Sequence, residues 1–336
     1  MRIGLTYDLR DEYLALGWSD HAVAEFDRVE TIDLLAAALT DLGHEPDRIG
    51  GADALIARLA AGDRWDLVLN IAEGRFGTGR ESLIPALLDH AEIPYTFGDP
   101  LCCALTLDKP AAKRILRDHG LPTPRFAVIA SPRDLISLNI PFPVFAKPSR
   151  DGSSKGVDDR SVCLDAISLR ETCDRLLAEY HQPVLVEEFL PGDEVTVGIV
   201  GTGPTAEVIG VLAVGLADRA AVYGYDTKER CEELVDYHLA PESAFTAEAR
   251  RLALAAFRAL DCRDAGRVDI RADAHGAPQI IEVNALAGLH PTHSDLPIMA
   301  TLAGISFTDL ISRIIASATH RAIAAPSLTN RSRCTS

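Results

Sequence analysis

Two strand-like stretches joined by a short turn constrain this chain more than any other feature. They span residues 266–270 and 281–284, and both alternate charged or polar residues with valine or isoleucine. The segment between them, residues 274–278, has the small and turn-forming residues of a hairpin connection. A hairpin fixes which residues of its two strands stand opposite each other. The pattern therefore predicts an antiparallel pair with one defined charged face.

The charged face of this hairpin carries two carboxylates. Because side chains alternate along a strand, Asp269 shares a face with Arg267, and Glu282 shares one with Asn284. A turn centred at 275–276 places Asp269 opposite Glu282, with Cβ atoms about 4.5–5.5 Å apart. Carboxylates this close repel unless they share a proton or bind a cation. The two acids and the amide predict a Mg²⁺ site, and the alternative is an exposed hairpin with solvated charges.

Length and charge narrow the classes of protein to which the chain can belong. With 336 residues it is too long for one small core, so two or three domains are expected. An apolar content of 47% and a charged content of 24% are ordinary for a globular protein. The formal charge of −16 argues against nucleic acid or an anionic membrane as a partner. No apolar run reaches the roughly 18–20 residues that a membrane span needs.

The N-terminus and the cysteines both indicate a cytoplasmic protein. A strand pattern begins at the first residues, with no signal peptide ahead of it. The cysteines are odd in number and scattered, without the spacing of a zinc site or a disulfide framework. A reduced cytoplasm fits such thiols, which we expect to be small buried apolar residues. The seven are Cys102, Cys103, Cys163, Cys173, Cys231, Cys262 and Cys334.

The first part of the chain, residues 1–97, alternates strand and helix. This order predicts a parallel sheet of βαβ units in a Rossmann-like domain. Apolar residues recur at helical spacing from Phe26 to Leu42, and Gly43 ends that helix. Strands are expected at 3–7, 66–71 and 94–97, and a second helix at 83–90.

The remaining residues predict two further units and a tail. Residues 98–190 mix helices with strands, and residues 191–320 are rich in antiparallel strand pattern and close with an apolar helix. Residues 321–336 are expected to be a flexible tail. The fold class is therefore α/β, with α+β character in the C-terminal part. Helices are expected at 109–119, 164–180 and 307–316, and strands at 126–129, 144–146 and 184–187.

Two segments of the central part could bind a nucleotide. A loop rich in glycine and serine, residues 149–156, follows a strand that contains Lys147. Backbone N–H groups of such a loop can surround phosphate, although the order of lysine and glycines is the reverse of a Walker A loop. A later strand ends in Glu187 and Glu188, which could accept hydrogen bonds from adenine or ribose. The alternatives are a polar surface hairpin and a solvated strand end.

The order of these features along the chain is more specific than any one of them. Lys109 opens a helix, Lys147 precedes the glycine-serine loop, and a third lysine, Lys228, comes between the acidic strand end and the carboxylate hairpin. This order resembles the ATP-grasp superfamily and, within it, the D-alanine–D-alanine ligase family. The resemblance covers about residues 1–318. It implies an ATP-grasp fold and an ATP-dependent ligase that joins a carboxylate to an amine through an acyl phosphate.

The resemblance also implies a role for individual residues. ATP is held by Lys109, Lys147, Ser153, Ser154, Glu187, Glu188, Leu190, Glu194 and Lys228. Of these, Ser153 in the phosphate flap and Lys228 at the γ-phosphate also take part in catalysis. Two Mg²⁺ ions, or Mn²⁺ in their place, are held by Asp269, Glu282 and Asn284. Arg267 and the Gly288 N–H stabilise the oxyanion, Ser294 holds the second substrate's carboxylate, and Glu25 orients the first substrate's amine.

The chain departs from the family pattern where substrates are expected. Glu73 takes the place of a histidine, Glu229 that of an aromatic residue, Lys155 that of an apolar flap residue, and Ala287 that of a proline. The resemblance implies small amino acids as substrates and a homodimer. Three functions follow: a ligase like D-alanine–D-alanine ligase, used in peptidoglycan synthesis; an amino-acid or dipeptide ligase of a biosynthetic or resistance pathway; or a catalytically inactive ATP sensor. Glu73 and Glu229 are expected to set which amine is accepted.

Overall fold

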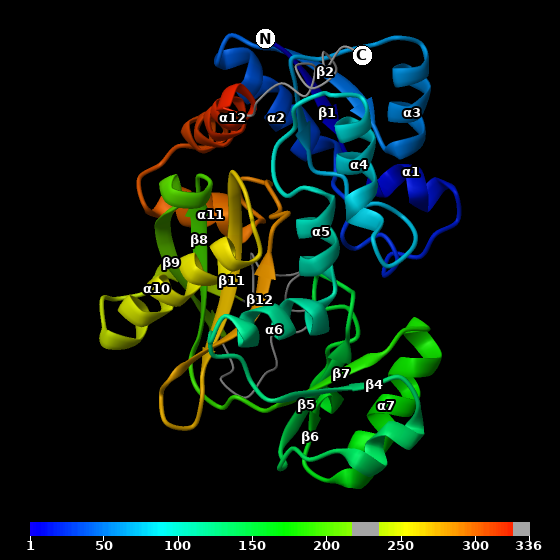
Figure 1. The fold of residues 1–336 in the computed structure, drawn as a ribbon, viewed down its shortest axis with the longest axis vertical. Helices are drawn as coiled ribbons and strands as arrows, with labels where there is room; N and C mark the ends of the chain where they lie inside the picture. Colours follow the sequence, from blue (N-terminus) through cyan, green and yellow to red (C-terminus); the bar gives the residue numbers. More distant parts are fainter. Residues whose placement is uncertain (217–234, 325–336) are drawn as a thin grey trace, which may run out of the picture.

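Three sheets follow one another along the chain in the computed structural model, which describes residues 1–216 and 235–324. In Figure 1 the first sheet lies at the top, the third in the middle and the second at the bottom. Helices α5 (Pro100–Leu107) and α6 (Lys109–Asp118) connect the first sheet to the second. This arrangement agrees with the predicted order of a parallel-sheet unit followed by two units of different architecture.

The first sheet is parallel, as the βαβ pattern predicts, and has the strand order β2-β1-β3. Helix α2 buries Ile32, Leu35 and Leu39 in the core beside this sheet, which explains the helical spacing of those residues. The strands are β1 (Arg2–Thr6), β2 (Glu45–Gly50) and β3 (Leu67–Asn70). The helices are α1 (Arg10–Ala15), α2 (Val29–Asp41), α3 (Ala52–Ala60), the 3₁₀ helix η1 (Arg80–Ser82) and α4 (Leu83–His90).

Two details of this unit differ from the sequence-based expectation. The strand expected at 94–97 is reduced to one isolated bridge between Tyr95 and Val68. Phe97 has a φ of 68°, which ends extended pairing, and its N–H donates to the Asp264 carboxylate at 2.8 Å. Strand β2 was not expected because its edge position leaves it polar rather than alternating apolar and polar.

The second sheet is antiparallel, with the order β4-β7-β5-β6, and α7 covers one face. The side chain of Asp165 caps α7 by accepting from the N–H groups of Ile167 and Ser168, which fixes where this helix begins. The strands are β4 (Phe126–Ile129), β5 (Val144–Pro148), β6 (Val162–Cys163) and β7 (Val184–Glu188). The helices are η2 (Pro132–Ser137), η3 (Asp159–Ser161) and α7 (Ala166–Tyr180).

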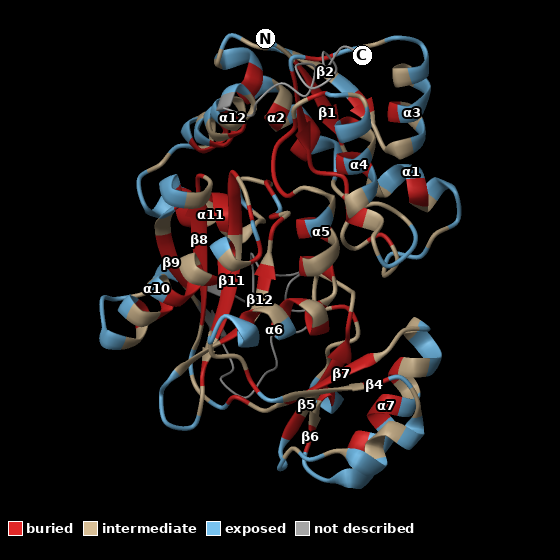
Figure 2. Ribbon diagram, in the orientation of Figure 1, coloured by how far each residue is buried: buried red, intermediate tan, exposed pale blue. Residues whose placement is uncertain are grey.

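The third sheet is the largest and is antiparallel throughout, with the order β10-β9-β8-β11-β12. Figure 2 shows that its central strands are buried, with α10 and α11 packed nearby. The strands are β8 (Glu194–Val200), β9 (Glu207–Leu216), β10 (Val235–Leu239), β11 (Ala265–Ala272) and β12 (Pro278–Asn284). The helices are η4 (Gly203–Thr205), α10 (Ala244–Ala259), α11 (Asp295–Leu302) and α12 (Phe307–Ala324).

Helix α12 joins the end of the described chain to its beginning. Its apolar residues share one core with α2 and β1. The tail was expected from residue 321, but the structure continues α12 through Ala324. The reason is an ion pair of 2.7 Å between Arg321 and the fully buried Asp264, which also accepts from the Ser317 hydroxyl. Residues 325–336 lie outside the described part.

Two further expectations concern the membrane and the thiols. Within the described residues no single helix is both long and apolar enough to span a membrane; only α11 and α12 taken together, with a bend of 113°, have the required length and composition. The described cysteines are free thiols and all are buried, as expected of small apolar residues. They are Cys102, Cys103, Cys163, Cys173 and Cys262; Cys231 and Cys334 lie outside the described residues.

Candidate active site

The predicted hairpin is formed by β11 and β12, and Asp269 stands opposite Glu282. The turn differs from the expectation, because Ala272 pairs with Pro278, which centres the turn on His275. A register shift next to Asp269 adds one residue to β12 and restores the carboxylate pair. The bulge thus compensates for the turn, and the charged faces of the two strands meet as predicted.

Hydrogen bonds and cations hold both carboxylates of the hairpin. Asp269 accepts from the Thr196 hydroxyl at 2.8 Å and from the Asn284 amide at 3.1 Å. Glu282 Oε1 lies 2.9 Å from the Nζ of Lys109. Burial would raise the pKa of Glu282, but Lys109, Lys147 and Arg267 outweigh it and lower the pKa to about 2. Glu282 is therefore ionised at every physiological pH.

The oxygen atoms of this hairpin fit a metal shared with a phosphate ligand. Within residues 1–216 and 235–324, no group of three or more His, Cys, Asp or Glu could hold a metal ion alone. Mg²⁺ in nucleotide sites is usually held by one or two carboxylates, with phosphates and water completing its shell. Asp269, Glu282 and the Asn284 side-chain oxygen have this composition.

A buried carboxylate in the lining of the smaller cavity bridges two lysines. Glu187, at the end of β7, lies 2.9 Å from the Nζ of Lys147 on β5 and 2.5 Å from the Nζ of Lys113 on α6. All three side chains are at most 10% exposed. Burial would raise the pKa of Glu187, but the two lysines outweigh it and hold the pKa below its usual value.

Lys113 was missed by the sequence-based search. A signal was available: Lys113 follows Lys109 by four residues, so both lie on one face of α6. Glu188, the neighbour of Glu187, is half-buried at the edge of the smaller cavity and pairs with Arg125 at 2.9 Å. Side chains alternate along β7, which explains why two consecutive glutamates have different surroundings.

Two cavities meet at the hairpin. The smaller, of about 130 Å³, is lined by expected ATP-binding residues. Those in its lining are Lys109, Lys147, Ser153, Ser154, Glu187, Glu188, Leu190 and Glu194. The larger, of about 490 Å³, contains the expected substrate residues Glu25, Glu73, Gly288 and Ser294. Six residues line both cavities: Lys109, Gly152, Ser153, Arg267, Glu282 and Asn284.

The glycine-serine loop is fixed by the N-terminal unit. Glu25 accepts from the Gly152 N–H at 2.5 Å and lies 2.8 Å from the Nζ of Lys155. Arg80 completes the group at 3.1 Å from Glu25. Burial would raise the pKa of Glu25, but Arg80 and Lys155 outweigh it and lower the pKa. The charge of Glu25 is therefore compensated within the protein. A Cβ at residue 152 would lie 2.5 Å from Glu25 Oε1, so a larger residue there would displace this carboxylate.

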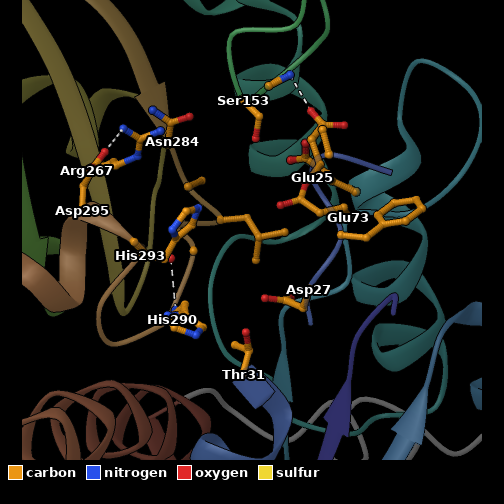
Figure 3. A pocket seen from close by; sticks show the side chains of 18 of the residues that line it. Glu25, Asp27, Thr31, Glu73, Ser153, Arg267, Asn284, His290, His293 and Asp295 are labelled. Atoms are coloured by element: carbon orange, nitrogen blue, oxygen red, sulfur yellow. Dashed lines mark hydrogen bonds and ion pairs between the residues drawn. The ribbon is translucent and has the colours of Figure 1, made fainter. Parts of the chain in front are cut away.

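The larger cavity has two walls of opposite character, shown in Figure 3. Asp27 and Glu73 project from the N-terminal unit on one side, and Arg267 and Asn284 from the hairpin on the other. Arg267 is itself held by Asp295 at 2.7 Å. On the hairpin side, the Ser294 hydroxyl accepts from the His290 N–H at 3.1 Å. A Cβ at Gly288 would lie 2.7 Å from that hydroxyl, so a larger residue there would displace it.

We call the carboxyl groups of Asp27, Glu73 and Glu81 in the larger cavity its acidic wall, and the pKa values of all three are raised. Burial, with Glu81 and Glu25 as neighbours, raises the pKa of Glu73 well above its usual value. Burial also raises the pKa of Glu81 to about 7, and that of Asp27 to about 7. These acids repel one another and are poorly solvated, so the wall is unstable when all of them are ionised.

We expect Glu81 to make the protein less stable as the pH rises. The folded chain holds this proton to about pH 7, whereas the unfolded chain releases it near 4.5. Stability is therefore lost between these values, by on the order of 2–3 kcal/mol. Denaturant unfolding from about pH 5 to about pH 8 measures the slope of the unfolding free energy against pH. Glu81→Gln should flatten it, whereas the exposed control Glu12→Gln should not; equal slopes in all three proteins would contradict the prediction.

Two expected residues cannot be placed. Lys228, expected at the γ-phosphate, and Glu229, expected beside the substrate, lie outside the described residues. Tyr237 on β10, which the sequence analysis did not select, lines the larger cavity. Its position follows strand pairing of β10 with β9, a long-range contact that no local sequence pattern indicates.

Comparisons with known proteins agree with this geometry. A family model described as the C-terminus of D-ala D-ala ligase matches residues 115–316. A D-alanine–D-alanine ligase of Cupriavidus pinatubonensis is 34% identical over 289 residues, which are 84% of each chain. An uncharacterized protein of Sinorhizobium fredii is 32% identical over 299 residues, covering 84% of this chain and 85% of its own.

A solved structure has the same fold. The D-alanine–D-alanine ligase of Bacillus anthracis superposes with a TM-score of 0.74 at 22% identity, over 96% of this chain and 99% of its own. A structure of that protein complexed with ATP gives the same score and covers 98% of its own chain. The fold class expected from the sequence is thereby confirmed.

The three sheets, with a carboxylate hairpin between two cavities, define an ATP-grasp enzyme of the class that forms amide bonds. The family model covers more than half of the chain, and the curated relatives are matched over most of theirs. The chain belongs to the D-alanine–D-alanine ligase family. The resemblance and the enzyme class inferred from the sequence are both confirmed.

Proposed function

We propose that this protein is an ATP- and Mg²⁺-dependent ligase that joins two amino acids, in the manner of a D-alanine–D-alanine ligase. The observation that carries the proposal is the meeting of the two cavities at the hairpin. Lys109, Arg267, Glu282 and Asn284 belong to both linings, so a phosphoryl group in one cavity lies beside a carboxylate in the other. Transfer between bound groups needs this kind of proximity.

The smaller cavity takes the nucleotide in this proposal. Lys109 and Lys147 neutralise the phosphates, and the N–H groups of the loop with Ser153 and Ser154 cover them. The side chain of Glu187 is engaged by Lys113 and Lys147, so contact with adenine falls to the backbone of the β7 end and to Leu190. Lys228 is proposed for the γ-phosphate on the family resemblance alone.

Asp269, Glu282 and Asn284 would hold Mg²⁺, or Mn²⁺ in its place. When bound there with the phosphates, the metal would disperse the charge of the transferring phosphoryl group. Lys109 bridges the metal hairpin and the nucleotide cavity, since it contacts both Glu282 and the Asp151 carbonyl oxygen. Its ammonium is thus positioned to keep the phosphates in line with the substrate carboxylate.

The reaction then takes place in the larger cavity. The first substrate's carboxylate oxygen attacks the γ-phosphorus, giving an acyl phosphate and ADP. The amine of the second substrate attacks the acyl carbon, and phosphate leaves as the amide bond forms. Arg267 and the Gly288 N–H stabilise the negative oxygen of the tetrahedral intermediate. Ser294 lies beside Gly288 and would hold the carboxylate of the second substrate.

The identity of the two amino acids is open to test. Alanine is proposed from the family, whereas the acidic wall with Glu73 and the engaged Glu25 favours other substrates. Use of ATP and amino acids suits a cytoplasmic enzyme, and the family suggests a homodimer, which light scattering would test.

The decisive experiment is phosphate release from ATP with Mg²⁺ and a panel of D- and L-amino acids, alone and in pairs. We expect release that depends on an amine–carboxylate pair and stops when EDTA removes the metal. Mass spectrometry of the product should show one new amide bond. If no pair gives release while ATP still binds, the protein is a nucleotide sensor and the proposal is wrong.

A further inference from the structure

Two carboxyl groups of the acidic wall face the larger cavity without a hydrogen bond or ion pair to any described residue. Glu81 is 9% exposed and lines the cavity, yet it makes no hydrogen bond or ion pair with any described residue. Glu73 lines the same cavity, and within residues 1–216 and 235–324 it too has no such partner. A buried carboxylate is normally hydrogen-bonded or paired, so the buried Glu81 without a partner, with the half-buried Glu73 in the same cavity, indicates a missing cationic ligand.

The carboxylate of Glu25, in the same cavity, differs from Glu73 and Glu81 because its charge is compensated by partners within the protein. It has the Gly152 N–H, Lys155 and Arg80 as partners, all within 3.1 Å. Because these partners fix the flap, Glu25 is not available to a substrate amine. The amine must therefore be received elsewhere on the wall, and Glu73 and Glu81 are the acids without partners.

The opposite wall determines how a substrate lies. Arg267 stands across the cavity from Asp27 and Glu73 (Figure 3). Ser294 and Gly288 line the same cavity. A substrate with its carboxylate toward Arg267 extends its positive end toward Glu73 and Glu81. An α-ammonium supplies one positive charge, whereas the wall also includes Asp27, whose carboxyl is close enough to disfavour ionisation of Glu73. One ammonium therefore engages only part of the wall.

We propose that one of the two substrates is an amino acid with a cationic side chain, whose second positive charge is received by Glu73 and Glu81. This deepens the proposed ligase function and rests on it for the catalytic readout. The cavity volume of about 490 Å³ is within the range of small-molecule sites. The binding step itself needs only the acids and the cavity, so it can be tested separately.

The catalytic test compares amino acids matched in carbon number. Lysine is paired with norleucine, ornithine with norvaline, and 2,4-diaminobutyrate with 2-aminobutyrate, in both configurations, with D-alanine or the same compound as the other substrate. In at least one pair, kcat/KM for phosphate release should favour the cationic member about tenfold or more. Glu73→Gln and Glu81→Gln should each reduce that ratio about tenfold, and the exposed control Glu12→Gln should not change it. An active enzyme without this preference, or a ratio that neither variant changes, overturns the proposal.

Calorimetric binding of the same pairs, with ADP and Mg²⁺ present, separates this inference from the proposed function. If no pair releases phosphate but the cationic member binds about tenfold more tightly, and Glu73→Gln and Glu81→Gln remove the difference, the site stands and the ligase assignment fails. If both members bind equally, or neither binds, the acids are a self-contained protonated cluster and the inference is wrong.

Discussion

Replacing Glu282 by glutamine is expected to lower phosphate release at least about a hundredfold while the fold stays intact. Glu282 faces Asp269 across the hairpin and belongs to both cavity linings. Glutamine keeps the shape but removes the negative charge that would attract the metal, whose contribution to phosphoryl transfer is several kcal/mol. Initial rates of ATP-dependent phosphate release at saturating substrate measure the loss.

Asp273→Asn is the matched control for this variant. Asp273 lies in the turn of the same hairpin and accepts from the N–H groups of His275 and Ala277. An amide oxygen can still accept both bonds, so rate and stability should stay near wild type. If Glu282→Gln retained even a tenth of the activity, the assignment of Glu282 as a metal ligand would be wrong. A lost unfolding transition would show instead that the carboxylate is structural.

Replacing Glu187 by glutamine is expected to destabilise the protein by about 3–5 kcal/mol. The substitution leaves Lys113 and Lys147 buried without their shared anion, and removing one partner of a buried ion pair has a cost of this size. Urea unfolding followed by intrinsic fluorescence and circular dichroism measures the change. Nucleotide affinity should also fall, because two uncompensated lysines no longer keep one orientation.

The neighbouring residue provides the control. Glu188→Gln breaks an ion pair with Arg125. The Arg125 side chain is 60% exposed and that of Glu188 37%, so solvent screens the pair and its loss should change stability little. Lys113→Met should be milder than Glu187→Gln, since it leaves one anion with one cation. Equal effects of Glu187→Gln and Glu188→Gln would mean that the buried triad is not a significant source of stability.

The hairpin shows which structural features the local sequence pattern can predict. Alternation along two strands and a turn at 274–278 were enough to predict that Asp269 meets Glu282, although the exact centre of the turn and the bulge were not predicted. Helix α4 matched its expected bounds, since its apolar spacing is local information. Strand β2 was not predicted from the sequence. A polar edge strand forms because it pairs with its neighbour, and its own sequence carries no strand pattern.

The surroundings of the charged residues required the tertiary structure. The sequence determined the order of lysines, glycine loop and carboxylates, and with it the family and the class of reaction. Only the packing of the units decided that Lys113 joins Glu187, that Glu25 fixes the flap, and that Glu81 lines the substrate cavity. The physical reason is that strand alternation and helix spacing are set by the local backbone. The partner of a charge depends on which distant segments the core brings beside it, and so does the solvation that sets its pKa.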